Sequence, residues 1–172
     1  MYSIRAEKPQ DYAKIKQVND LAFNQENEGK LIEALRSSDA FVQELSLVAE
    51  TEDEAIIGHI LFSKIVIKTE QGYVPSLALA PMSVTPAKQN QGVGSALVEE
   101  GLKQAGKLGF KSVIVLGHPE YYPRFGFTPA SEKSIKPPFD VPKEVFMALE
   151  LKPGALSGVE GVVQYPDAFM NV

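Results

Sequence analysis

Hydrophobic positions follow two different periods along the chain, and each change of period marks a boundary between predicted elements. Alternating positions or short apolar runs, which are typical of β-strands, occupy residues 3–6, 45–49, 56–67, 73–84, 112–116, 145–151 and 161–164. Apolar positions three or four residues apart, which are typical of amphipathic helices, run from residue 9 to about residue 22, over 28–36 and over 93–108. The last helix joins two predicted strands, so we expect a right-handed crossover, a parallel strand pair and an α/β fold class.

One predicted strand, residues 73–84, is interrupted by a proline. Pro81 has no backbone N–H to donate to a neighbouring strand, so it predicts a bulge or a sheet edge. The acidic residues 50–54 indicate a solvated turn, which makes 45–49 and 56–67 an antiparallel hairpin. With no linker or internal repeat in the sequence, residues 1–172 are predicted to form one domain.

The segment from Gln89 to Gly94 predicts an anion-binding loop at the start of the helix over 93–108. The first N–H groups of a helix have no intrahelical partner, and the helix dipole adds partial positive charge there. Gly92 and Gly94 lack Cβ atoms, so a diphosphate could approach the backbone closely. The same glycines are also compatible with tight packing alone. A dinucleotide site is disfavoured, because the glycines do not follow the first strand and Lys111 stands near the expected acidic position.

Composition narrows the class of protein. Hydrophobic residues make up 44% of the chain and charged residues 23%, and no stretch has the roughly 18 apolar residues of a membrane span. The N-terminus lacks the apolar region of a secretory signal, so we expect a cytoplasmic protein. Zero cysteines and two histidines predict no metal site. A net charge of −5 and a pI near 5.1 argue against nucleic-acid binding and fit an amine-bearing partner.

Two blocks of residues resemble one enzyme family. The strand, the loop Gln89-x-x-Gly-x-Gly94 and the following helix are similar to the acetyl-CoA-binding motif of the GNAT N-acetyltransferase superfamily. Tyr121-Tyr-Pro-Arg-Phe-Gly-Phe127 resembles the family's Tyr-x-x-x-Gly-Phe box, in the form found in a branch of predicted bacterial acetyltransferases. The resemblance implies an acyl-CoA N-acyltransferase fold, with helices flanking a mixed central sheet that is splayed between its fourth and fifth strands. It also implies acetyl-CoA as cosubstrate and a primary amine as acceptor.

The resemblance assigns roles position by position. Tyr122 matches the family tyrosine that protonates the leaving thiolate, although an aromatic packing role fits it as well. The implied cofactor-binding residues are Met82, Ser83 and Val84 beside the pantetheine arm, and Gln89, Asn90, Gln91, Gly92, Val93, Gly94 and Ser95 around the pyrophosphate. A non-catalytic acyl-CoA-binding or sensing module is the alternative function, and a dinucleotide-dependent enzyme is a third.

The sequence departs from the family pattern in two places. The turn after 112–116 lacks the common asparagine, and residues 76–84 lack the glutamate that commonly draws a proton from the amine, so the general base is unidentified. His59, in an apolar strand, is interpreted as a hydrogen-bonded sheet residue rather than a base, while His118 is a minor candidate for proton transfer.

Several other residues carry weaker expectations. Glu26, Glu28 and Glu33 are candidates for binding a cationic substrate, but solvated positions are commoner for such residues. Arg124 is a candidate CoA contact, with a surface role favoured, and Tyr121 is interpreted as a packing residue or a substrate wall. The C-terminal strands, punctuated by proline and glycine, suggest contact with a second subunit in a homodimer.

Overall fold

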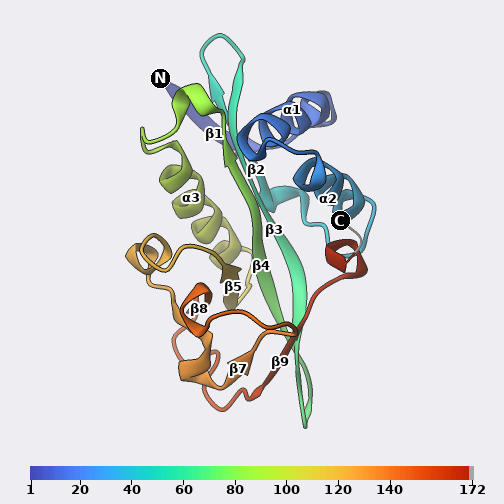
Figure 1. Cartoon of the computed structure of the whole chain (residues 1–172), viewed down its shortest axis with the longest axis vertical. Coiled ribbons are helices and arrows are strands. Elements are labelled where there is room, and N and C mark those ends of the chain that lie inside the picture. Colours follow the sequence, from blue (N-terminus) through green and yellow to red (C-terminus); the bar gives the residue numbers. More distant parts are fainter. Residues whose placement is uncertain (171–172) are drawn as a thin grey trace.

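The computed structural model describes residues 1–170, and its strands join into one sheet with helices on both faces (Figure 1). The helices are α1 (Tyr12–Phe23), α2 (Asn27–Arg36) and α3 (Val93–Lys107). The strands are β1 (Tyr2–Ala6), β2 (Ser46–Thr51), β3 (Ile56–Thr69), β4 (Gly72–Val84), β5 (Ser112–Leu116), β6 (Thr128–Pro129), β7 (Ile135–Lys136), β8 (Phe146–Glu150) and β9 (Gly161–Gln164). The strand order β1-β2-β3-β4-β5-β8-β6, with β9 pairing β3 and β7, confirms the predicted α/β class.

The sheet opens between its fourth and fifth strands. β4 and β5 are parallel, but they pair only at Leu77 with Val113 and Ala78 with Ile114. β4 continues to Val84 without β5 beside it, whereas β5 pairs with β8 along its whole length. The predicted splay is therefore confirmed, and it leaves one edge of β4 without a neighbouring strand beyond Ala78.

A bulge lies next to this opening. Met82 is opposite Ile60 and Leu79 is opposite Phe62, so two residues of β4 face a single residue of β3. One of the two is Pro81, which cannot donate a ladder hydrogen bond. The bulge expected from the sequence is present, and it turns the end of β4 relative to the rest of the strand.

The three helices cover opposite faces of the sheet (Figure 1). α3 packs through Leu97 and Val98 on one face, and α1 and α2 pack through residues such as Ile15 and Leu35 on the other. In α3, a Cβ atom at Gly101 would lie 2.1 Å from Phe62 Cε1, so only glycine lets the helix approach the sheet this closely.

Some boundaries differ from the sequence prediction. Residues 9–11 form a separate 3-10 turn, and α1 begins at Tyr12. β6 and β7 were not predicted, because strands of two residues are too short to produce an alternating pattern.

Candidate active site

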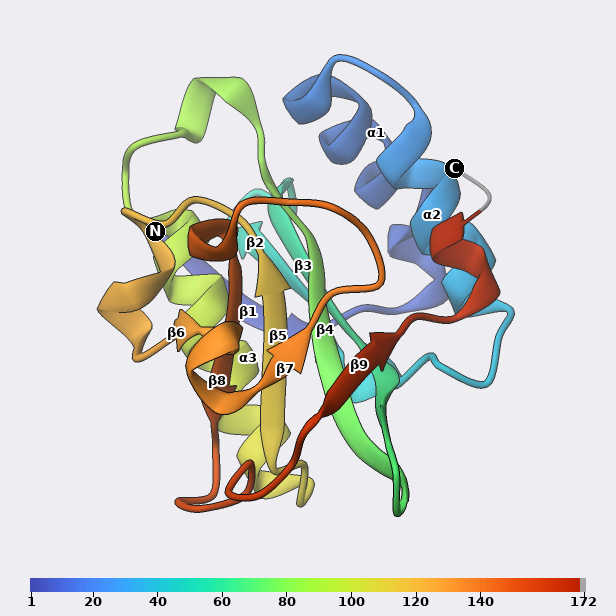
Figure 2. The same ribbon diagram turned by 60° about the horizontal axis from the view of Figure 1, so that its bottom comes forward.

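A cleft of about 620 Å³ lies where β4 and β5 separate, beside the start of α3. The β4–α3 loop and the end of α1 contribute opposite walls of this cleft and are both visible in Figure 2. The lining residues are Ala22, Phe23, Met82, Ser83, Val84, Lys88, Gln89, Asn90, Gly92, Val93, Gly94, Ser95, His118, Tyr121 and Arg124. The opening in the sheet and the glycine loop thus belong to one site.

The glycine loop has the geometry of an anion site. Gly92 is the N-cap residue of α3 with φ of 87°, a left-handed conformation that glycine adopts without the steric cost of a Cβ. Within the described chain no side chain caps this helix, and its first turn carries no acidic residue. The N–H groups of Val93, Gly94 and Ser95 therefore lie at the end of the helix that borders the cleft, and they lack the intrahelical hydrogen-bond partners that later residues have. Phosphate oxygens suit both these donors and the helix dipole.

The structure brings together all but one of the predicted cofactor-binding residues. Gln89 donates a side-chain hydrogen bond of 3.0 Å to the carbonyl of Val84, which ties the loop to the end of β4. Gln91 does not line the cleft; its side chain donates to Ala87 O at 3.4 Å. Ser83 lines the cleft, and its hydroxyl is buried with no hydrogen-bond partner among residues 1–170.

Two cationic side chains lie at the cleft. Arg124 Nε donates to Tyr121 O at 3.0 Å, and its guanidinium carbon lies 4.5 Å from the centre of the Tyr121 ring. Lys88, on the other side of the loop, was not singled out from the sequence, although a basic residue just before an anion loop is a usable signal. Ala22 and Phe23 were also missed, because only the tertiary fold brings the end of α1 to this place.

The two adjacent tyrosines have different surroundings. Tyr121 lines the cleft, and its hydroxyl is 2.8 Å from Ser95 Oγ in the first turn of α3. Tyr122 is only 7% exposed and is not among the lining residues. Its ring packs edge-on against Phe127 at 5.7 Å and fills the space beside Gly117, where a Cβ atom would lie 2.4 Å from Tyr122 Cε2. Burial, with a smaller contribution from the charge of Tyr121, raises the pKa of Tyr122 to about 12.

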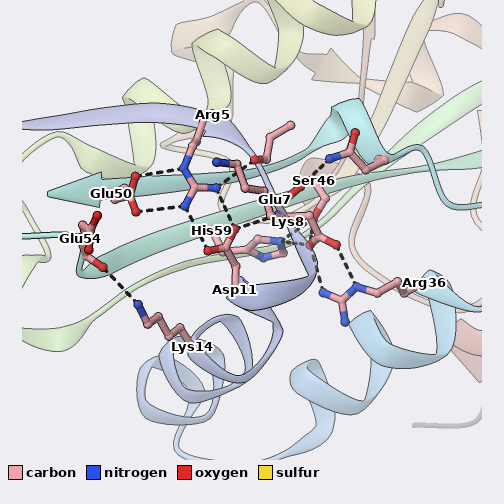
Figure 3. A network of polar contacts seen from close by, with 12 residues as sticks. Arg5, Glu7, Lys8, Asp11, Lys14, Arg36, Ser46, Glu50, Glu54 and His59 are labelled. Atoms are coloured by element: carbon pink, nitrogen blue, oxygen red, sulfur yellow. Dashed lines mark hydrogen bonds and ion pairs between the residues drawn. The ribbon is translucent and has the colours of Figure 1, made fainter.

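His59 lies outside the cleft, in the buried polar network of Figure 3. Its Nε2 atom is 2.9 Å from Ser46 Oγ, and the Ser46 hydroxyl donates to Glu7, which accepts two hydrogen bonds from Arg36. Burial, reinforced by the charge of Arg36, lowers the pKa of His59 to about 3. These contacts fit a hydrogen-bonded sheet residue. His118, by contrast, lines the cleft.

The acidic residues near α1 and α2 do not reach the cleft. Glu26 pairs with Lys16 at 3.3 Å, and Glu28 accepts a hydrogen bond from Gln25. Glu33 is exposed on α2. None of the three lines the cleft, so they occupy the solvated positions that the sequence favoured.

No helix within residues 1–170 combines the length and apolar character needed to cross a bilayer. In the same described portion, no three histidine, cysteine or acidic side chains gather closely enough to hold a metal ion.

Comparison with known families agrees with the fold and the cleft. The family described as Acetyltransferase (GNAT) domain matches residues 3–130. The uncharacterised N-acetyltransferase YjhQ of Escherichia coli K12 is 35% identical over 154 residues, which cover 86% of this chain and 84% of YjhQ. The uncharacterised N-acetyltransferase YhbS of the same strain is 32% identical over 166 residues, covering 96% and 97%. The chain therefore belongs to the GNAT acetyltransferase family.

Solved structures of relatives extend this result. The structure of E. coli YhbS in complex with CoA superposes with a TM-score of 0.91 at 30% identity, covering 98% of this chain and 92% of that one. A GNAT acetyltransferase from Brucella melitensis in complex with acetyl-CoA gives a TM-score of 0.80 at 36% identity, covering 98% of each chain. The predicted family, fold and enzyme class are confirmed.

Proposed function

We propose that this protein transfers the acetyl group of acetyl-CoA to a primary amine by direct attack on the thioester. The observation that carries the proposal is the cleft itself, in which an uncapped helix start and an unpaired strand edge meet at the opening of the sheet. Two relatives that share the fold over almost the whole chain were solved with CoA or acetyl-CoA.

The donor fits the cleft in one orientation. The pyrophosphate lies against the N–H groups of Val93, Gly94 and Ser95, with Lys88 and Arg124 supplying positive charge at the rim. The pantetheine arm, which carries amide groups, then runs along residues 82–84 of β4. The edge of β4 facing β5 has backbone hydrogen-bonding capacity there, because β5 no longer pairs with it.

This placement puts the thioester at the open end of the sheet. The amine nitrogen bonds to the carbonyl carbon, an oxyanion develops, and the carbon–sulfur bond breaks to release CoA thiolate. A backbone N–H near Val84 polarises the carbonyl, a contribution of about 3 kcal/mol by comparison with other oxyanion donors. Holding the two reactants in line supplies most of the remaining acceleration, and no covalent enzyme intermediate is required.

Tyr122 is proposed as the acid that protonates the thiolate. It adjoins Tyr121, which lines the cleft, and it stands at the position of the family tyrosine four residues before Gly126. Its raised pKa keeps the phenol protonated throughout the neutral range, as an acid requires. The amine loses its own proton to water or to a base; His118 is the one histidine among the described residues that line the cleft.

A non-catalytic acyl-CoA-binding module is the alternative, and one observation favours it. No carboxylate lines the cleft within residues 1–170, so the usual proton acceptor of the family is absent from the wall. In either case we propose that residues 1–172 act as one domain in the cytoplasm; a sheet that includes both β1 and β9 supports the single domain.

Titration calorimetry followed by a thiol-release assay distinguishes these readings. Both predict acetyl-CoA binding, and no heat of binding at millimolar acetyl-CoA would remove both. The enzyme reading predicts release of free CoA that depends on an added primary amine. A binding module gives the same titration and no amine-dependent release.

A further inference from the structure

A second hollow, of about 360 Å³, lies at the same opening of the sheet but on the face opposite α3. Its lining residues are Ala78, Leu79, Ala80, Ile114, Leu116, Phe139, Tyr165, Phe169 and Met170. In Figure 2 the loop between β7 and β8 passes in front of β4 and β5, with α3 behind these strands, and the segment after β9 runs from the sheet toward α2. These segments supply the aromatic wall of the hollow.

The second hollow and the cleft share two strands. Ala80 of β4 lines the hollow, and Met82 of the same strand lines the cleft. On the other side of the opening, Leu116 lines the hollow and His118 lines the cleft. Two residues along a strand correspond to about 6 to 7 Å. A molecule in the hollow would therefore lie within a short chain's length of the proposed thioester position.

The chemistry of the hollow is apolar and aromatic. No charged side chain is among its lining residues in the described structure. Phe139 and Tyr165 are stacked with ring centres 6.0 Å apart, and Phe169 lies 5.1 Å from Tyr165. Leu116 and Phe139 remain 46% and 40% exposed. Exposed apolar side chains gathered around a concavity of this size are typical of a small-molecule site.

We infer that this hollow holds the apolar portion of the acceptor, and that the acceptor is a primary amine joined to an aromatic ring by two or three carbon atoms. The inference rests on the proposed function. With bonds of about 1.5 Å, two or three carbon atoms place the nitrogen about 4 to 5 Å from the edge of the ring, which is comparable with the separation of Ala80 and Met82 along β4. The amine stays in the solvated space where the hollow meets the cleft, while the ring is removed from water.

The same chemistry disfavours other acceptors. A polyamine would place a second ammonium group against Ile114, Leu116 and the aromatic wall, where none of the lining side chains could pair with it. A free amino acid would place a carboxylate there at a similar cost. Both classes lose hydration without gaining a partner.

A panel of amines tests this inference with acetyl-CoA as donor. The probes are 2-phenylethylamine, 3-phenylpropylamine, ethylamine and spermidine, and the measured quantity is kcat/KM. We expect the two phenylalkylamines to exceed ethylamine and spermidine by about 10- to 100-fold, the value of burying one aromatic ring. Acetylation of spermidine or ethylamine with equal efficiency would overturn the inference and leave the proposed function intact. Binding of acetyl-CoA without turnover of any amine would overturn the proposed function, and with it the acceptor role of the hollow.

Two matched variants locate the effect. Leu116→Asn changes the hollow, and Leu108→Asn changes a leucine of similar exposure, 43% against 46%, at the end of α3. We expect Leu116→Asn to lower kcat/KM for 3-phenylpropylamine at least about 5-fold while leaving the acetyl-CoA Kd unchanged. Leu108→Asn should change neither value. An equal loss in both variants, or no loss in Leu116→Asn, would show that the amine does not use this hollow.

Discussion

Replacing Tyr122 with phenylalanine removes one oxygen atom from the candidate site and leaves the packing of the ring in place. The hydroxyl makes no hydrogen bond within residues 1–170, and the side chain is 7% exposed, so the ring contacts with Phe127 and Gly117 survive. We expect the free energy of unfolding to change by less than about 1 kcal/mol. Any large effect on activity then reports on chemistry and not on folding.

The size of that effect follows from the acidity of the phenol. General acid catalysis typically contributes about 10²- to 10⁴-fold. With a pKa of about 12, Tyr122 is a weaker acid than an ordinary tyrosine and is poorly matched to a thiolate whose conjugate acid has a pKa near 8.5. We therefore expect the low end of the range, a loss of about 10²-fold in kcat, which corresponds to about 2.7 kcal/mol.

The assay compares kcat and acetyl-CoA affinity in Tyr122→Phe and Tyr121→Phe. Tyr121 is the matched control, because it lines the cleft and its hydroxyl bonds to Ser95, so its loss should weaken acetyl-CoA binding more than it lowers kcat. Wild-type kcat should show no decline caused by Tyr122 ionisation until the pH nears 12. Unchanged kcat in Tyr122→Phe, with a large loss in Tyr121→Phe, would refute the assignment of the acid.

Three further predictions concern stability and binding. Gly101→Ala should destabilise the fold by about 1 to 2 kcal/mol in urea unfolding, because the new Cβ atom collides with buried Phe62 and this cost outweighs the gain in helix propensity. Gly106→Ala, whose added Cβ atom meets open space, should stabilise the fold by about 0.5 to 1 kcal/mol. A stability change of the same sign in both variants would contradict the packing of α3. Lys88→Ala should raise the acetyl-CoA Kd about 5-fold in calorimetry, with a difference that shrinks as salt is added; a salt-independent Kd ratio would argue against a phosphate contact. The folded-state pKa of His59 lies below its value of 6.5 in the unfolded chain, so the unfolded state binds more protons between pH 6.5 and 3. The free energy of unfolding should therefore fall by about 3 kcal/mol from pH 6.5 to pH 4. His59→Gln should show a shallower fall in the same series of unfolding measurements.

Local patterns predicted most of the fold because each main element carries its own signal. The apolar stripe of α3, the bulge at Pro81 and the buried run of β5 all occur where the sequence indicates them. The short strands β6 and β7 could not be predicted, because each consists of two residues held by pairing with β8 or β9. Tertiary contacts alone define them.

The candidate site also has one part that the sequence predicts and another that it does not. The donor side follows from a contiguous segment, since Gln89 to Ser95 is one loop and one helix turn. The contributions of Phe23 and of the aromatic residues of the second hollow come from parts of the chain far from this loop in sequence. Distances between such segments have no local signature. The acceptor side therefore became visible only in the folded structure.

Transfer of a labelled acetyl group shows directly whether this protein acetylates an amine. The protein is incubated with acetyl-CoA carrying an isotopic label in the acetyl group and with 3-phenylpropylamine, and the products are separated and analysed by mass spectrometry. We expect labelled N-acetyl amine in an amount equal to the CoA released, at a rate that Tyr122→Phe lowers about 10²-fold. Saturation with acetyl-CoA in calorimetry, with no labelled amide from any primary amine tested, would contradict it.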